Sequence, residues 1–286
     1  MPLHLSASFA FELENTVDAL LQFEAAPLAD QHIHEANTSF SVGESIRRIS
    51  GEDSIGERIW LRGQGLLEVD YSAKVALDRS PVALGQLDTV PMADLPAGAV
   101  RYLFDSRYCH PTEFVDFAAD QFGAITKGAE TVAAIHDWVA SNLEYTPGAS
   151  TAATTATDTF HAGHGICRDF AHLVVTLARA CSIPARYVAC YAPGVTPQDF
   201  HAVAQVYLRD PANGNAGAWH LVDATGMADP AETAIIGVGR DATDVSLATS
   251  FGPMRFVSSE IAVSHADSPK NKGKAQALDD DRAALT

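Results

Sequence analysis

Hydrophobic and polar side chains alternate along much of the first hundred residues, which is the pattern of β-strands that bury one face. The clearest run is the first, in which every second residue from Leu3 to Leu13 is apolar. More strand-like runs follow between glycine-containing segments, at residues 31–42, 45–50, 57–62 and 65–77. Short strands at this spacing predict an antiparallel sandwich or small barrel. We therefore expect an N-terminal antiparallel β-rich domain that covers residues 1–105.

The pattern changes to a helical one after residues 79–99, where prolines and glycines predict a loop between two domains. Beyond the loop, apolar residues recur every three or four positions over 114–122 and 132–143, as in amphipathic helices. Strand-like runs return at 185–191, 202–208 and 219–224, and the last two are joined by a predicted hairpin loop. Residues 106–262 are therefore predicted to form an α+β domain, and the polar residues 263–286 a disordered tail.

Composition narrows the choice of partner and compartment. The formal net charge is −17, with 19 Lys and Arg residues against 36 Asp and Glu residues. Nucleic acids and anionic membranes are recognised through basic surfaces, so neither is expected as a partner. The N-terminal residues lack the basic start of a signal peptide, and no apolar run reaches the roughly 18 residues of a membrane span. We predict a cytoplasmic protein whose four cysteines are reduced thiols.

A further helical pattern begins at Cys167, directly after a loop that contains Gly163 and Gly165. Unpaired backbone N–H groups and the helix dipole stabilise negative charge at a helix N-terminus, so a thiolate is favoured there. A thiolate nucleophile also needs a base and a group that orients the base. His201 and Asp223 lie at the ends of two predicted antiparallel strands, so the fold can bring both to Cys167.

Motifs in these segments have the order and spacing of the bacterial transglutaminase-like family, which the chain resembles from about residue 100 to residue 226. They read Gly165-Ile166-Cys167-Arg168-Asp169-Phe170-Ala171-His172, Ile183-Pro184-Ala185-Arg186-Tyr187-Val188, Asp199-Phe200-His201-Ala202 and Trp219-His220-Leu221-Val222-Asp223-Ala224-Thr225. The resemblance implies a papain-like α+β domain with the transglutaminase core. It also implies that Cys167 is the nucleophile, His201 the base and Asp223 the orienting residue. No cofactor and no metal is expected.

The implied reaction is acyl transfer from an amide of a peptide or protein, through a thioester on Cys167. Two positions depart from the family, which usually has Trp where this chain has Val203 and Pro where it has Ala224. Val203 shares a strand face with His201, so loss of the large apolar ring should open the wall of the site to water. Hydrolysis by a cysteine peptidase or amidase is therefore preferred over protein cross-linking by a transglutaminase (protein-glutamine γ-glutamyltransferase).

Two other classes of function stay open. His161, His164 and Cys167 are closely spaced and could bind zinc, although no Cys-x-x-Cys pair supplies a second half of the site. A binding protein descended from an enzyme is the other possibility, and the intact set of Cys167, His201 and Asp223 counts against it. The oligomeric state is left open.

Several neighbouring residues are assigned to structure. His172 is expected on a face of the helix away from Cys167, and Asp169 is interpreted as a first-turn carboxylate favoured by the helix dipole. Arg168 is expected to be a solvated surface charge. The other cysteines are interpreted as structural thiols: Cys109, Cys181 and Cys190.

Overall fold

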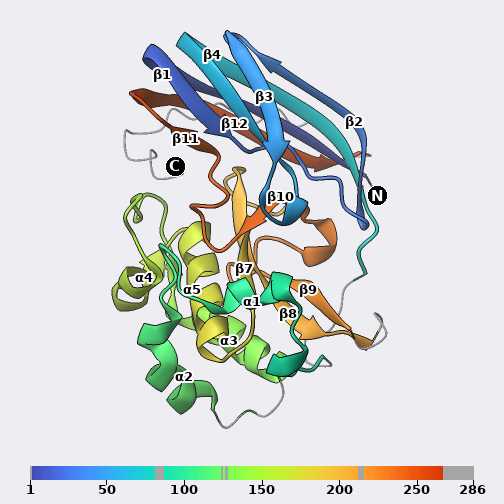
Figure 1. Cartoon of the computed structure of the whole chain (residues 1–286), viewed down its shortest axis with the longest axis vertical. Coiled ribbons are helices and arrows are strands. Elements are labelled where there is room, and N and C mark those ends of the chain that lie inside the picture. Colours follow the sequence, from blue (N-terminus) through green and yellow to red (C-terminus); the bar gives the residue numbers. More distant parts are fainter. Residues whose placement is uncertain (1, 81–86, 124, 126–127, 212–215, 267–286) are drawn as a thin grey trace.

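The computed structural model describes residues 2–80, 87–123, 125, 128–211 and 216–266. Within these residues a six-stranded antiparallel sheet lies at the top of Figure 1, and the helices lie below it. A four-stranded antiparallel sheet lies between them. The first sheet has the order β11-β1-β4-β2, with β12 also paired to β1 and β3 to β4. Its strands are β1 (Leu3–Leu21), β2 (Gln31–Phe40), β3 (Ser45–Ser50), β4 (Glu57–Leu77), β11 (Ala248–Ser250) and β12 (Met254–His265).

The long strand β1 organises this sheet, because it pairs with β4 on one edge and with β12 on the other. Its alternating apolar residues form one buried face, as the sequence predicts. The predicted break between strands 57–62 and 65–77 is wrong, since β4 continues through Gly63 and Gly65. The register with β1 shifts opposite these glycines, so they belong to a bulge rather than to a turn.

The C-terminal strands pair with the N-terminal sheet, whereas the predicted boundaries assign most of their residues to the α+β domain. Strand β12 crosses the predicted boundary at residue 262, and both β11 and β12 belong to the sheet of β1 rather than to the α+β part. The physical reason is burial, because Ile261 and Val263 pack into the same core as Leu5. Residues 263–265, predicted to start the tail, are part of β12, and residues 267–286 lie outside the described residues.

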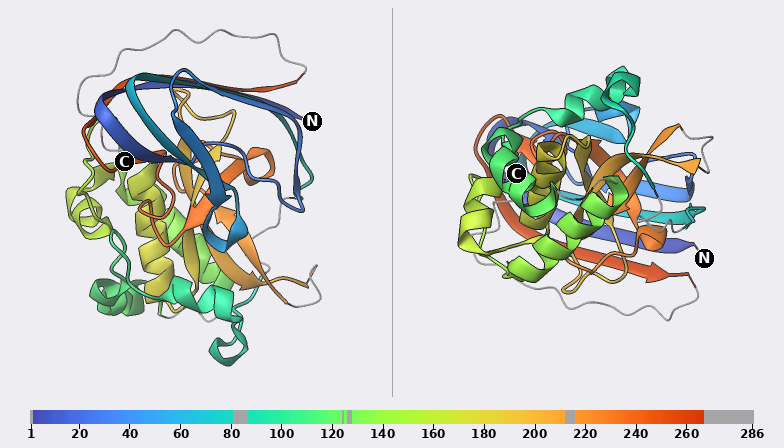
Figure 2. Two further views of the ribbon diagram at one scale, coloured as in Figure 1. Left: turned by 45° about the horizontal axis from the view of Figure 1, so that its top comes forward. Right: turned by 90° about the horizontal axis from the view of Figure 1, so that it is seen from below.

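The second sheet has the order β10-β7-β8-β9. Its strands are β7 (Ala185–Tyr191), β8 (His201–Arg209), β9 (Gly217–Val222) and β10 (Ala234–Gly239). Helix α5 (Cys167–Ala180) packs against β8 and β7, and α3 (Gly128–Asn142) and α4 (Ala156–Ala162) pack against α5. Figure 2 shows the green and yellow helices on the side of the molecule away from the blue strands. The predicted mixed α+β architecture is therefore confirmed.

Shorter elements complete the chain. The predicted helix at 114–122 is α2 (Val115–Phe122), preceded by η5 (Pro111–Phe114). Part of the predicted 79–99 loop is ordered as η3 (Met92–Asp94) and α1 (Ala97–Val100), while residues 81–86 lie outside the described residues. The remaining elements are η1 (Glu52–Ser54), η4 (Arg101–Leu103), β5 (Glu144–Tyr145), β6 (His164–Gly165) and η7 (Pro230–Glu232).

The two sheets share a hydrophobic core. Tyr191 of β7 is buried among the residues of the large sheet, and Ile236 of β10 joins the same cluster. The hydroxyl of Tyr191 donates a 2.7 Å hydrogen bond to the carbonyl of Phe23, just after β1. None of the helices in the described part of the chain is both long and apolar enough to cross a membrane. The cytoplasmic location stays a prediction.

Because β12 contributes to the core beneath β1, Ile261→Ala should lower the free energy of unfolding by about 2–4 kcal/mol. Val257→Ala on the same strand is the matched control, since Val257 is 39% exposed and Ile261 only 5%. The control should change stability by no more than about 0.5 kcal/mol. Urea unfolding followed by circular dichroism measures both values, and equal effects would show that β12 is not part of this core.

Candidate active site

Cys167 is the first residue of α5, as the sequence predicts, and the loop before it is tightly held. β5 and β6 pair in parallel, so Tyr145 lies opposite Gly165, and Thr146 N–H donates to Gly165 O at 2.9 Å. A Cβ atom on Gly165 would lie 2.7 Å from the Cβ atom of Asp169, so a side chain does not fit there. Gly163 ends α4 with a left-handed φ of 71°. The two glycines thus let the chain turn from α4 into the start of α5.

Asp169 and Arg168 stabilise the first turn of α5 through hydrogen bonds. Asp169 accepts hydrogen bonds from the backbone N–H of Ile166 and the hydroxyl of Ser150, both at 2.9 Å. The prediction that Arg168 is a surface charge is wrong, because it is only 2% exposed. Its guanidinium donates to Ser150 Oγ at 2.6 Å and to Thr151 O at 2.5 Å. The loop that carries Ser150 and Thr151 folds over the helix start and replaces the water that a surface arginine would bind.

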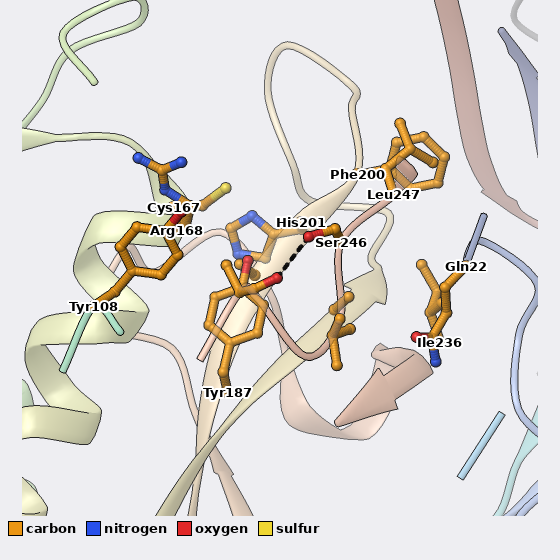
Figure 3. Close-up of a pocket in the computed structure, with 14 residues that line it drawn as sticks. Gln22, Tyr108, Cys167, Arg168, Tyr187, Phe200, His201, Ile236, Ser246 and Leu247 are labelled. Atoms are coloured by element: carbon orange, nitrogen blue, oxygen red, sulfur yellow. Dashed lines mark hydrogen bonds between the residues drawn. The ribbon is translucent and has the colours of Figure 1, made fainter. Parts of the chain in front are cut away.

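The imidazole of His201 lies between Cys167 and Asp223. Its Nε2 is 3.0 Å from Asp223 Oδ2, and in Figure 3 its ring and the sulfur of Cys167 point toward one another. Because Nε2 faces a carboxylate, Nε2 carries a proton, and Nδ1 is the ring nitrogen that is not bound to Asp223. Nδ1 is buried and has no hydrogen-bond partner of good geometry among the described residues. His201 begins β8 and Asp223 directly follows β9, the strand next to it, as the sequence predicts.

The surroundings of His201 favour its charged form. Burial by itself lowers the pKa of His201, but the hydrogen bond to Asp223 and the negative charges of the Cys167 thiolate and Asp223 outweigh burial and raise it to about 10. Burial would raise the pKa of Asp223, yet its hydrogen bonds and the charge of His201 lower it below its usual value of 3.8. His201 is therefore an imidazolium at neutral pH, with Asp223 ionised beside it.

Asp223 is itself held by residues whose role the sequence reasoning missed. Thr225 donates to Oδ1 from its backbone N–H at 2.9 Å and from its hydroxyl at 2.7 Å. The backbone N–H of Ala228 donates to Oδ2 at 2.7 Å. The carbonyl of Asp223 accepts a hydrogen bond from His136 Nε2 at 3.1 Å, which connects the site to α3. Thr225 stands inside one of the quoted motifs, so the sequence carried a signal for it.

Tyr145 is another residue whose role the sequence reasoning missed. Burial and the neighbouring charge of Cys167 raise the pKa of Tyr145, while a hydrogen bond with the backbone N–H of Cys167 acts in the opposite direction. The pairing of β5 with β6 fixes Tyr145 beside the loop that enters α5. Its side chain packs against the small cluster that contains Cys167 and Ala171. A phenol hydroxyl is therefore positioned beside both the thiol and the first N–H of the helix.

A cavity of about 550 Å³, including its open mouth, adjoins Cys167 and His201. Val203 was expected to open its wall, and this expectation is wrong. Val203 shares the face of His201 but is 2% exposed and packs with Val188, Val195 and Leu221 in a separate cluster. Among the described residues no tryptophan lines the cavity. Its walls are formed by Gln22, Tyr108, Cys167, Arg168, Tyr187, Ala189, Phe200, His201, Ala202, Ile236, Ala242, Val245, Ser246 and Leu247.

The other histidines of the region do not meet Cys167 in this way. His172 is fully buried, stacks on Tyr108 with 5.1 Å between ring centres, and accepts a hydrogen bond from Ala242 N–H at 3.1 Å. Burial lowers the pKa of His172 to about 3, so it is neutral. His161 and His164 are exposed, and within the described residues no three His, Cys, Asp or Glu side chains are placed to hold a metal ion. The zinc alternative therefore has no supporting arrangement in that part of the chain.

The remaining cysteines occupy apolar surroundings. All four cysteines are free, as predicted. Burial raises the pKa of the Cys109 thiol to about 12, that of Cys181 to about 11, and that of Cys190 well above its usual value. These three thiols are poor nucleophiles at neutral pH because they stay protonated.

Comparisons with known proteins agree with the predicted family and fold. Residues 115–224 match the model of the Transglutaminase-like superfamily, which confirms the resemblance for this segment. An uncharacterised protein of Mycobacterium leprae is 34% identical over 126 residues, which are 41% of this chain and 42% of that protein. A solved structure from Cytophaga hutchinsonii, described as a candidate cysteine protease, is 29% identical with a TM-score of 0.84. That likeness covers 95% of this chain and 93% of the other, so it includes the N-terminal sheet.

The electrostatic arrangement predicts the titration of His201. Its imidazole should titrate near pH 10, and in Asp223→Asn its pKa should fall toward the ordinary value of 6.5 because the main opposing charge and hydrogen bond are lost. With the folded pKa raised, the ion pair stabilises the fold fully below about pH 6.5 and is lost as the pH rises through about 10. NMR of ¹³C-labelled histidine measures the pKa. Asp137→Asn, which alters the exposed partner of His136, should leave His201 unchanged. A wild-type value near 6.5 would contradict the prediction.

Proposed function

We propose that this protein is a cysteine-dependent enzyme that hydrolyses an amide bond of a peptide or protein through a thioester on Cys167. The observation that carries the proposal is the arrangement of Cys167 at the N-terminus of α5, facing a histidine whose other nitrogen is bound to Asp223 at 3.0 Å. Similarity to the Transglutaminase-like superfamily and to the Cytophaga hutchinsonii candidate cysteine protease supports the same class of chemistry.

The first half of the reaction makes the thioester. The Cys167 thiolate attacks the carbonyl carbon of the amide, and the carbonyl π electrons move to the oxygen. His201 then delivers its Nδ1 proton to the amide nitrogen as the C–N bond breaks, and the amine leaves. In the second half, neutral His201 takes a proton from water, the hydroxide attacks the thioester, and the carboxylic acid and the Cys167 thiolate are released. Asp223 keeps the imidazole oriented throughout and stabilises its cation.

The oxyanion formed at each attack needs hydrogen-bond donors. The backbone N–H of Cys167 is one candidate, because it lies at a helix N-terminus next to the sulfur. The second candidate is Tyr145 of β5, whose side chain packs against the cluster that contains Cys167. In the free protein its hydroxyl lies next to the same N–H group, which lowers the pKa of Tyr145 against the effect of burial. We infer that a substrate carbonyl takes this position and that the phenol then turns its O–H toward the developing negative charge.

Water is preferred over an amine as the acyl acceptor. Val203 does not affect this choice, because it lies outside the cavity. The support comes from the cavity itself, since the walls formed by described residues contain no tryptophan ring that would screen the thioester from water. The likeness to a candidate cysteine protease over nearly the whole chain supports the same choice. Cross-linking of proteins through glutamine stays the alternative outcome.

A non-catalytic binding protein is disfavoured by the same contacts. The buried carboxylate of Asp223 accepts hydrogen bonds from Thr225, Ala228 and His201. A buried charge loses the free energy of its hydration, and a purely structural site could avoid this loss with an uncharged side chain. Such an arrangement is common where a pKa must be tuned for catalysis.

Partitioning between water and an amine tests the proposal. The protein is incubated with casein and an excess of a labelled primary amine, and new peptide termini and released ammonia are compared with amine incorporation. Hydrolysis should dominate, and His201→Ala should lower it by about 1,000-fold or more because proton transfer and the ion pair are lost. His161→Ala, at an exposed histidine on α4, is the matched control and should retain activity. Dominant amine incorporation would instead identify a transglutaminase.

Tyr145→Phe should lower kcat by about 100-fold, which is typical for loss of one oxyanion donor. The ring and its packing are kept, so KM and the free energy of unfolding should change little. Tyr207→Phe on β8 removes the phenol hydroxyl of a residue that does not line the cavity, and serves as the control. Steady-state kinetics on a cleaved peptide measures the effect. An unchanged kcat in Tyr145→Phe would remove this hydroxyl from the mechanism.

A further inference from the structure

The cavity beside Cys167 is built by two distant parts of the chain. Tyr187 and Ala189 on β7 and Ala202 on β8 line it from within the segment that matches the superfamily model. The opposite wall comes from outside that segment, with Gln22 after β1 and Leu247 just before β11. Figure 3 shows Gln22 and Leu247 across the cavity from Cys167.

The walls are chiefly apolar. Phe200, Ile236, Val245 and Leu247 contribute aromatic and aliphatic carbon, and three alanines leave the space open: Ala189, Ala202 and Ala242. A charged side chain placed there would lose its hydration without gaining a partner, whereas an apolar side chain would leave water at no such cost.

Several charged and polar side chains of the lining already have partners within the protein. The guanidinium of Arg168 is bound to Ser150 and Thr151. Gln22 accepts a hydrogen bond from Arg58 Nε at 3.4 Å through Oε1, while its buried Nε2 has no partner among the described residues. His201 is bound to Asp223. Ser246 donates its hydroxyl proton to Ala242 O at 2.8 Å, which is the dashed line in Figure 3. The charged side chains of the described lining are therefore paired within the protein, and an ionic side chain of a substrate would compete with those partners.

We propose that this cavity is a specificity pocket for a large apolar side chain, aliphatic or aromatic, on the acyl side of the scissile amide. The proposal rests on the proposed function and adds the class of substrate to it. The acyl part stays attached to Cys167 through both half-reactions while the amine leaves, so a pocket that adjoins the sulfur holds the acyl part throughout. Because Gln22 and Leu247 line this pocket, the segments after β1 and before β11 would contact the substrate as well.

The test uses the full chain and a set of peptides that share one scaffold and vary at the residues on either side of the scissile bond. Mass spectrometry of the products gives kcat/KM for each peptide in one mixture. Leucine or phenylalanine on the acyl side should be favoured over aspartate, lysine or glycine by about tenfold or more, as expected for a filled apolar pocket. Variation on the amine side should matter less.

Two variants connect the preference to the cavity. Ala189→Leu fills it, so the ratio of kcat/KM for the leucine peptide to that for the alanine peptide should fall by about tenfold. Leu247→Lys places a cation at the half-buried opposite wall, and should raise the rate for glutamate peptides relative to leucine peptides. Ala140→Leu is the matched control, because Ala140 is exposed on α3 and its substitution should leave both ratios unchanged.

The outcomes separate this proposal from the proposed function. Peptide cleavage with no preference, or with a preference only on the amine side, overturns the pocket and leaves the hydrolase standing. The pocket is also overturned if Ala189→Leu lowers kcat/KM equally for every peptide and Leu247→Lys leaves the ratio of glutamate to leucine peptides unchanged. If no peptide is cleaved although iodoacetamide still modifies Cys167, the proposed hydrolysis fails and the pocket proposal fails with it.

Discussion

The burial of α5 is the constraint on which the rest of the structure depends. Every residue from Cys167 to Arg179 is buried, including charged and polar ones, so the charged groups depend on partners inside the protein. Arg179 shows how this is done, because its guanidinium donates to backbone carbonyls of three separate segments. These acceptors are Ala185 O at 2.9 Å, Phe104 O at 3.0 Å and Arg240 O at 2.6 Å. One buried cation thus joins the start of β7, the linker before α2 and the loop after β10.

The same helix positions both sides of the candidate active site. Its first residue is Cys167, and its next turns hold the loop after β10 through His172 and Arg179. That loop continues into Val245 and Leu247, which form the apolar wall opposite the sulfur. A loss of the polar contacts on α5 would therefore displace the nucleophile and the substrate wall together. This coupling explains why the helix tolerates buried charges that apolar residues could replace at lower solvation cost.

The sequence predicted the parts of this arrangement that depend on local pattern. The glycines before Cys167 and the helical spacing after it predicted the start of α5. The alternation of apolar and polar residues predicted the strands beside His201 and Asp223. The return of β12 to β1 could not be predicted in this way, since the pairing partners lie at opposite ends of the chain. The exposed position expected for Arg168 failed for a related reason. A charged residue is normally solvated, and only the tertiary fold brings Ser150 and Thr151 over it.

The contacts of Asp223 explain how the electrostatics of the site are maintained. The raised pKa of His201 requires an ionised carboxylate at Nε2, but burial opposes that ionisation. Thr225 and Ala228 resolve the conflict by donating hydrogen bonds to both carboxylate oxygens. Because these donors come from the turn after β9, the backbone that positions Asp223 also keeps it charged. The charge state of His201 is therefore a property of that turn as much as of the three side chains themselves, and a substitution that loosens the turn would lower the pKa of His201 without touching the imidazole.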